Sequence, residues 1–158
     1  MLIKLRYAFY SFFLIFMTAT ITTYFVQQGL IPFYDILDKP LYTPEHQYFR
    51  YIWYVIYTLL FMGYYLALVV KKNLEQTLDL NALFMMQLFL QILWAFSFFY
   101  MQQIFVSAIV IILLDIVVAL LLHSLFFISR RAFLCFFPYF LWLLFATYLN
   151  VFLIFLNP

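Results

Sequence analysis

Long stretches without a charged side chain dominate the pattern of this sequence. Asp, Glu, Lys and Arg are absent from residues 7–34, 51–70, 80–114, 116–129 and 132–158. A helix needs about 20 apolar residues to cross the roughly 30 Å hydrocarbon core of a bilayer. The run 80–114 is too long for one crossing, and its most polar point is at residues 100–103. The pattern therefore predicts five membrane-spanning helices, near residues 5–27, 46–70, 81–101, 104–128 and 132–156.

The composition agrees with a helical membrane protein. Hydrophobic residues make up 70% of the chain and charged residues only 9%, whereas about a quarter of the residues of a globular protein carry charge. A membrane β-barrel would alternate apolar and polar positions along short strands, and these runs do not alternate. At 158 residues the chain has the size of one domain. We therefore predict an all-α membrane protein, with one five-helix domain over residues 1–158.

The placement of the basic residues predicts the orientation in the membrane. With five spans, one side of the membrane receives six of them, Lys4, Arg6, Lys71, Lys72, Arg130 and Arg131. Lys39 and Arg50 fall on the other side. Because cytoplasmic loops carry an excess of Lys and Arg, we expect the N-terminus in the cytoplasm and the first loop outside. The basic residues are scattered and form no dense patch, so no nucleic-acid partner is expected.

Polar and aromatic side chains recur at helical spacing in four of the spans. Residues spaced in this way share one face of a helix. The four stripes are Thr18 and Thr22; Phe49, Trp53 and Tyr57; Gln87, Gln91 and Trp94; and Tyr139, Trp142, Ala146 and Asn150. Ordinary packing explains any single stripe, because small and amide side chains commonly bridge membrane helices.

The depth of the three tryptophans favours a pocket over ordinary packing. In the orientation above, Trp53, Trp94 and Trp142 all lie in the outer half of the bundle, beneath the first loop. Tryptophan belts at the membrane surface are the competing explanation, and Trp53 fits such a belt. Trp94 and Trp142 lie deeper than a belt would place them. We therefore predict that the three tryptophans meet in one pocket.

Asp115 lies in the middle of the fourth predicted span. An ionisable side chain at that depth is costly and is a functional candidate by default. His123 follows eight residues later, more than two helical turns away, so the two do not form a direct acid–base pair. We prefer the interpretation that Asp115 is protonated or hydrogen-bonded within the bundle. With two distant histidines and a single cysteine, Cys135, no metal site is predicted.

Three motifs follow one another from residue 33 onward. The first covers the loop and second span, with Tyr34, Leu37, Lys39, Pro40, Pro44, Trp53 and Tyr57. The second covers the third span, with Gln87, Leu88, Leu90, Trp94, Phe98 and Phe99. The third covers the fifth span, with Pro138, Tyr139, Trp142, Phe145, Ala146, Leu149 and Asn150. Their order and spacing resemble the TspO/MBR family, also called translocator protein or peripheral-type benzodiazepine receptor.

The chain also departs from the family pattern. Phe33 and Tyr42 stand where the family has loop tryptophans, Glu45 replaces a proline, and Gln91 replaces an asparagine. Aromatic rings are kept at positions 33 and 42, but the indole N–H and its redox chemistry are lost. The C-terminal cholesterol-recognition segment of animal members is missing, since the chain reads VFLIFLNP after Asn150.

The resemblance implies a five-helix bundle, often a homodimer, whose first loop caps a ligand pocket. Family members bind protoporphyrin IX and haem-related tetrapyrroles, so such a molecule is the expected ligand, with membrane lipid as the other partner and no obligatory cofactor. The implied ligand-binding residues are Phe33, Tyr34, Lys39, Trp53, Tyr57, Gln91, Trp94, Trp142, Ala146 and Asn150. The residues 33–53 would then be a proline-stiffened lid, with Lys39 and Arg50 near the ligand's propionates.

Three functions remain open at this point. The first is a membrane receptor or sensor that binds tetrapyrroles, with a transport or regulatory role. The second is an enzyme that degrades porphyrin in light, with Trp53 and Trp142 as candidate residues, weakened by the loss of tryptophan at position 33. The third is a lipid or sterol carrier, weakened by the absent C-terminal segment. We expect a bacterial protein, because the chain lacks an Arg- and Ser-rich transit segment. Helical spans and the bias of basic residues to one side favour a cytoplasmic membrane over an outer membrane.

Overall fold

The computed structural model describes residues 2–70 and 74–157, and nearly all of them are helical. The helices are α1 (Leu2–Gly29), α2 (His46–Val70), α3 (Leu74–Ala95), α4 (Ile104–Ile128) and α5 (Arg130–Leu156). A short 3-10 helix, η1 (Tyr34–Ile36), lies in the first loop, and a π-helical turn, η2 (Phe96–Tyr100), continues α3. No strand occurs in the described residues. The five helices are long and apolar enough to cross a membrane, which confirms the predicted fold class.

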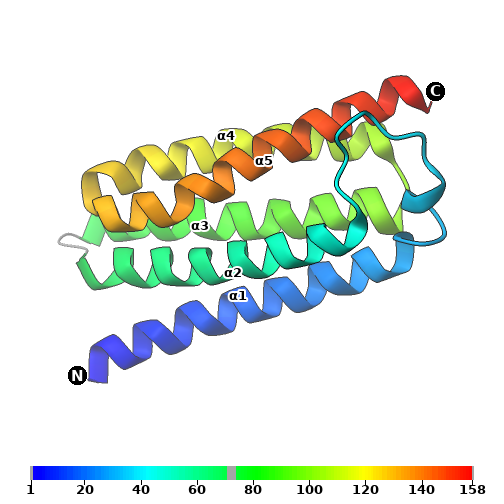
Figure 1. The fold of residues 1–158 in the computed structure, drawn as a ribbon. Helices are drawn as coiled ribbons and strands as arrows, with labels where there is room; N and C mark the ends of the chain where they lie inside the picture. The colour runs from blue at the N-terminus through cyan, green and yellow to red at the C-terminus, as the bar shows by residue number, and fades with distance from the viewer. Residues whose placement is uncertain (1, 71–73, 158) are drawn as a thin grey trace.

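The five helices form one bundle in which helices that follow one another along the chain run antiparallel (Figure 1). Around the bundle the contacts run α1, α2, α5, α4 and α3, and α3 with η2 returns to α1. The first loop, the α3–α4 junction and the C-terminus lie at one end, which we call the loop end. The N-terminus and the α4–α5 junction lie at the other end, here the basic end.

The two ends differ in charge as the sequence predicts. Lys4, Arg6, Arg130 and Arg131 lie toward the basic end, whereas Lys39 and Arg50 lie toward the loop end. Lys71 and Lys72, the other two basic residues predicted on the side of the basic end, lie outside the described residues. The direction in which the bundle crosses its membrane stays a prediction.

Closely packed aromatic rings join helices in the half of the bundle nearer the basic end. Tyr64 of α2 stacks on Phe84 of α3 with ring centroids 3.6 Å apart, and Phe136 of α5 meets Phe84 edge-on at 6.1 Å. Gly63 makes this approach possible, because a Cβ atom there would lie 2.6 Å from the Phe136 ring. Lipid is as apolar as these rings, so close van der Waals contact rather than burial from water stabilises the helix pairs.

Polar side chains join neighbouring helices within the bundle. The Tyr139 hydroxyl donates to Gln87 Oε1 at 3.1 Å, and Thr147 donates to Asp115 Oδ2 at 2.8 Å. The second bond agrees with the interpretation of Asp115 as a group hydrogen-bonded inside the bundle. His123 is exposed, and its ring lies 5.1 Å from that of Phe127.

The break between the third and fourth spans lies where the sequence predicts it. The α-helix of α3 widens into η2, where the Met101 N–H donates to the Phe96 carbonyl at 2.9 Å. Gln102 then adopts a left-handed conformation with φ of 56°, and α4 begins at Ile104. Gly29, the last residue of α1, packs directly on this turn, because a Cβ atom at Gly29 would overlap the Phe99 carbonyl.

Candidate ligand-binding cavity

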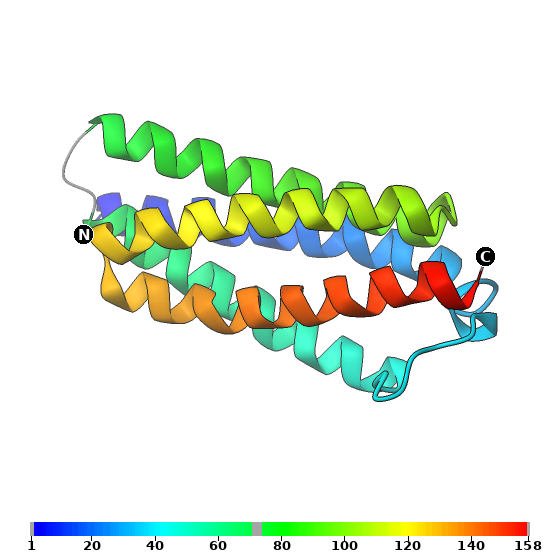
Figure 2. The ribbon, with the colours of Figure 1, turned by 90° about the horizontal axis from the view of Figure 1, so that it is seen from above.

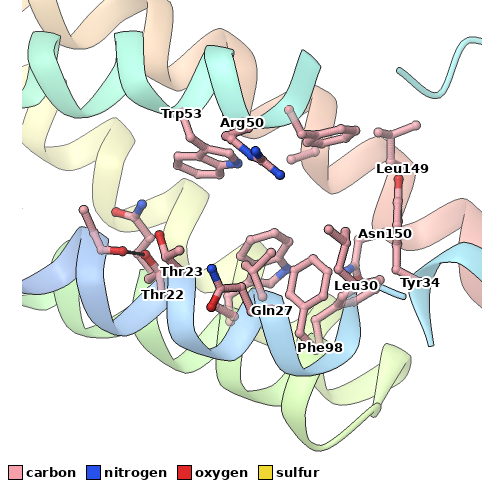
Figure 3. A pocket seen from close by; sticks show the side chains of 18 of the residues that line it. Thr22, Thr23, Gln27, Leu30, Tyr34, Arg50, Trp53, Phe98, Leu149 and Asn150 are labelled. Atoms are coloured by element: carbon pink, nitrogen blue, oxygen red, sulfur yellow. Dashed lines mark hydrogen bonds between the residues drawn. The ribbon is translucent and has the colours of Figure 1, made fainter. Parts of the chain in front are cut away.

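A cavity of about 330 Å³ lies inside the loop-end half of the bundle. Its walls come from α1, α2, α3 with η2, and α5, and Tyr34 of the first loop contributes from the loop end. Figure 3 shows Thr22, Thr23 and Gln27 of α1 facing Arg50 and Trp53 of α2 across this space. Small-molecule pockets start at about this volume and are often found between helices of a bundle.

A hydrogen-bonded chain across three helices forms the deep end of the cavity. Gln91 Nε2 of α3 donates to the Tyr57 hydroxyl of α2 at 3.1 Å. That hydroxyl lies 2.7 Å from Thr22 Oγ1 of α1. Thr22 Oγ1 in turn donates to the Thr18 carbonyl at 2.9 Å, so the Tyr57 hydroxyl donates to Thr22. The chain orients the Gln91 amide and fixes the spacing of α1, α2 and α3 at this level.

Aromatic rings form one continuous wall of the cavity. The rings of Trp53 and Trp94 lie 6.4 Å apart with planes tilted by 33°. Tyr57 lies 5.7 Å from Trp53, and Phe98 lies 6.0 Å from Trp94 in a stacked arrangement. Offset and tilted ring pairs of this kind contribute about 0.5–1.5 kcal/mol each beyond the area they bury. The wall presents π faces suited to a flat, largely apolar ligand.

Two buried polar atoms of the cavity residues have no hydrogen-bond partner in the described part of the chain. These are Gln91 Oε1 and Trp94 Nε1. A buried donor or acceptor without a partner costs about 1–3 kcal/mol. One is an acceptor and the other a donor, so a bound molecule carrying both kinds of group would satisfy the pair.

The first loop closes the cavity at the loop end. Tyr34 is buried, and its ring contacts Phe98 and Phe99 at 6.1 Å each. Burial, and to a lesser extent the charge of Asp35, raises the pKa of Tyr34 to about 12, so the phenol stays neutral. Lys39 Nζ lies 4.7 Å from the centre of the same ring, on its face, which adds a cation–π contact.

Asn157 fastens this loop to the end of α5. Its Nδ2 donates to the Asp38 carbonyl at 3.0 Å, and its Oδ1 accepts from the Asp38 N–H at the same distance. Both bonds use the backbone of Asp38, so they hold the chain path whatever side chain stands at that position.

Seven of the ten predicted site residues line the cavity, namely Tyr34, Trp53, Tyr57, Gln91, Trp94, Ala146 and Asn150. Phe33 packs against Phe98 at 5.7 Å behind the wall. Lys39 covers the Tyr34 ring and donates to the Asp35 carbonyl at 3.2 Å. These two residues support the lid and the wall rather than line the cavity.

Trp142 lies outside the cavity, so the structure does not bring the three tryptophans together. Its ring meets Phe49 at 5.3 Å and lines a separate apolar groove between α2 and α5. The reason is helical geometry, because eight residues separate Trp142 from Asn150 and rotate it by about 80° about the helix axis. The residues of α5 that were predicted to share one helix face therefore lie on two sides of the helix.

The sequence interpretation missed most of the contribution of α1. The lining residues of that helix are Ala19, Thr22, Thr23, Val26 and Gln27, and Leu30 follows directly after it. Their spacing of three and four residues is that of a single helix face. The signal was present in the sequence, but apolar residues on every side of α1 obscured it. Arg50 is a further lining residue, four positions into α2.

Comparison with known proteins agrees with this architecture. The model of the TspO/MBR family matches residues 11–156. The tryptophan-rich protein TspO of Chlorobaculum tepidum is 35% identical over 129 residues, which is 80% of each chain. The protein of the same name from Archaeoglobus fulgidus is 32% identical over 135 residues, 85% of this chain and 86% of that one. A family match over residues 11–156 of a chain with five apolar helices establishes that this protein belongs to the TspO/MBR family.

Proposed function

We propose that this protein is a membrane receptor or sensor that binds a tetrapyrrole such as protoporphyrin IX in the cavity between α1, α2 and α3. The observation that carries the proposal is the aromatic wall of Trp53, Trp94 and Phe98, which offers stacking surfaces to a flat ring system. Membership of the TspO/MBR family supports the membrane receptor or sensor part of the proposal.

The polar groups of the cavity suit the edges of such a ligand. Pyrrole N–H groups and carbonyl or carboxyl oxygens are the donors and acceptors that Gln91 Oε1 and Trp94 Nε1 lack. The cavity holds about 330 Å³ and is open on one side, so a large planar ligand extends beyond it. Its acid groups then remain near the membrane surface, where charge is least costly.

Titration of the purified protein with protoporphyrin IX tests this function. The protein is placed in lipid nanodiscs, and tryptophan fluorescence is followed first in the dark and then under illumination. Saturable quenching in the dark, with no spectral change in light, is the result expected of a receptor or sensor. Absence of saturable quenching at micromolar ligand contradicts the proposal.

The same samples separate the two alternative functions. Bleaching of the bound porphyrin to a defined product in light, lost in Trp53→Phe, would identify a light-dependent degrading enzyme. Displacement of bound porphyrin by a sterol would identify a lipid or sterol carrier. Trp53 lines the cavity and Trp142 does not, so the enzyme alternative now rests on Trp53.

A further inference from the structure

The side chains that line the cavity are exposed on one side only. Thr23 and Gln27 of α1 and Arg50 and Tyr54 of α2 are exposed. The lining residues of α3 and α5, among them Gln91 and Asn150, are buried or half-buried. The cavity therefore opens sideways, through a gap between α1 and α2 that we call the lateral mouth, defined by Thr23, Gln27, Arg50 and Tyr54.

The lateral mouth follows from the way α1 leans across the bundle. Toward the basic end α1 packs on α2, with the rings of Phe12 and Phe61 at 6.2 Å. Thr22 and Tyr57 also join the two helices, with their hydroxyl oxygens 2.7 Å apart. The two helices diverge toward the loop end (Figure 2). There α1 packs on η2 instead, with the rings of Phe25 and Phe96 at 5.2 Å.

The lateral mouth lies within the membrane-spanning length of both helices. Arg50 is four residues from the start of α2, which places it about 6 Å along the helix, and Tyr54 lies about 6 Å deeper. Polar residues at such a surface are costly and usually functional. The opening thus faces the loop-side half of the bilayer, with Arg50 at its polar edge.

Arg50 is a cation available to a ligand at this opening. Within the described residues its guanidinium has no hydrogen-bond or ion-pair partner. Figure 3 shows its side chain reaching from α2 into the space opposite α1. Lys39, the other cation of the loop end, is engaged with the Tyr34 ring and the Asp35 carbonyl.

We propose that the cavity takes its ligand from the bilayer through the lateral mouth, and that Arg50 binds the ligand's carboxylate there. The ligand class is an amphiphilic carboxylic acid, with an apolar body in the cavity and the acid at the mouth. A guanidinium forms two parallel hydrogen bonds with a carboxylate, which gives it selectivity for the acid over a neutral ester. The proposal rests on the proposed function only for the identity of the ligand's apolar body. Any apolar body of suitable size would fit the cavity while its acid binds Arg50.

Two acid and ester pairs test the role of Arg50. The probes are protoporphyrin IX with its dimethyl ester, and the fluorescent fatty acid cis-parinaric acid with its methyl ester. Each is titrated into the full chain in phosphatidylcholine nanodiscs. We expect the wild type to bind at least one acid about tenfold more tightly than its ester, as a charge-assisted hydrogen bond would give. Arg50→Gln should abolish this preference, because the variant loses more affinity for the acid than for the ester.

The control is Arg131→Gln, which removes the same charge from the exposed start of α5 at the basic end. It should retain the preference for the acid. Arg50→Lys keeps the charge but loses the planar fork, so an intermediate preference is expected. An acid preference that survives in Arg50→Gln, or no preference in the wild type for either pair, overturns the proposal.

A matched pair of threonine variants tests the path itself. Thr23 and Thr20 are both exposed on α1, but only Thr23 lines the cavity. Thr23→Trp should slow both association and dissociation of the ligand about tenfold, because a large side chain narrows the lateral mouth without removing a binding group. Thr20→Trp should leave both rates unchanged in stopped-flow measurements. Equal rates in the two variants contradict sideways access.

The two probe pairs also separate this proposal from the proposed function. If protoporphyrin IX fails to bind while cis-parinaric acid shows a preference that depends on Arg50, the tetrapyrrole function is wrong and the lateral site stands. If protoporphyrin IX binds, neither acid is preferred over its ester and Thr23→Trp has normal rates, the function stands and the lateral site is wrong.

Discussion

The Thr22 Oγ1 atom of α1 lies 2.7 Å from the Tyr57 hydroxyl of α2 and joins two helices that diverge toward the loop end (Figure 2). The same hydroxyl accepts from Gln91 of α3. The Tyr57 side chain therefore sets both the depth of the cavity and the deep edge of its lateral mouth. A hydrogen bond between membrane helices contributes about 0.6 kcal/mol on average. The contact between Thr22 and Tyr57 therefore matters more for the position of the two helices than for the energy of the bond.

Removing the Tyr57 hydroxyl should loosen the deep end of the cavity. In Tyr57→Phe, Gln91 Nε2 loses its acceptor and Thr22 loses the bond it accepts, while its own bond to the Thr18 carbonyl remains. We therefore expect the free energy of unfolding to fall by about 1 kcal/mol. Thermal unfolding in detergent measures this change. Tyr48→Phe, at an exposed tyrosine of the same helix, serves as the control. Equal unfolding temperatures in the two variants would show that the chain of hydrogen bonds has no role in stability.

Trp94 and Trp142 should differ in their effect on ligand affinity. Trp94→Phe removes the unpartnered indole N–H beside the cavity, and we expect porphyrin affinity to fall about fivefold, as for one hydrogen bond of about 1 kcal/mol. Trp142→Phe should change affinity less than about twofold, since that ring lines the separate groove. Titration in nanodiscs measures both. A larger effect of Trp142 would favour the site drawn from the sequence motifs over the one in the structure.

The clamp between Asn157 and the first loop should control loop mobility. Asn157→Ala removes two hydrogen bonds to the Asp38 backbone, and we expect hydrogen exchange in residues 37–43 to accelerate roughly tenfold. Asp38→Ala is the matched control, because the clamp uses only the backbone of that residue. Mass spectrometry of the loop peptides gives the rates. If Asp38→Ala accelerates exchange as much as Asn157→Ala, the clamp has been assigned to the wrong groups.

Gly29 should be intolerant of a side chain. In Gly29→Ala the new methyl group would overlap the Phe99 carbonyl of η2, which is backbone and yields little. We expect a loss of about 1–3 kcal/mol in the free energy of unfolding, the usual cost of overpacking. Gln28→Ala, at the exposed neighbouring position, should leave stability nearly unchanged. Thermal unfolding compares the two, and similar curves would mean that α1 and η2 are less closely packed than described.

The packing of the first loop should weaken in alkali. Burial raises the pKa of Tyr34 from 10.0 to about 12, so the packed loop prefers the neutral phenol. The stability that Tyr34 contributes is therefore fully present below pH 10, and is lost as the pH rises from about 10 through about 12. A spin label at exposed Leu41, in a Cys135→Ala background, reports loop release. Tyr34→Phe should remove this component of the pH dependence.

The sequence alone determined which segments span the membrane, although α3 begins at Leu74, seven residues before the predicted start at 81. The second and fourth spans are predicted and observed over the same residues, 46–70 and 104–128. A bilayer requires about 20 apolar residues per crossing, so the length of each uncharged run limits where its helix begins and ends. The polar stretch at positions 100–103 marks the junction between the third and fourth spans. A backbone turn there needs water or protein partners for its polar groups, which the interior of a bilayer does not supply.

Part of the cavity was also available from the sequence. Trp53 and Tyr57, like Gln91 and Trp94, share one helix face by spacing alone, and the structure places all four at the cavity. Residues only three or four positions apart remain on one face however the helix is turned. These two pairs stay together at the cavity, whereas Trp142 and Ala146, also four positions apart, are separated, with Ala146 at the cavity and Trp142 at the groove.

Only the tertiary structure decided which faces meet and where the cavity opens. The rotation of each helix about its axis follows from close contacts between distant residues, such as Gly29 against Phe99 and Gly63 against Phe136. Those contacts turn Trp142 away from the cavity, bring the polar face of α1 into it, and leave Arg50 at a gap in the wall. Hydrophobicity determines that a segment spans the membrane, but lipid contacts every apolar face equally well. The choice of partner face therefore depends on shape, which a pattern of residue types does not encode.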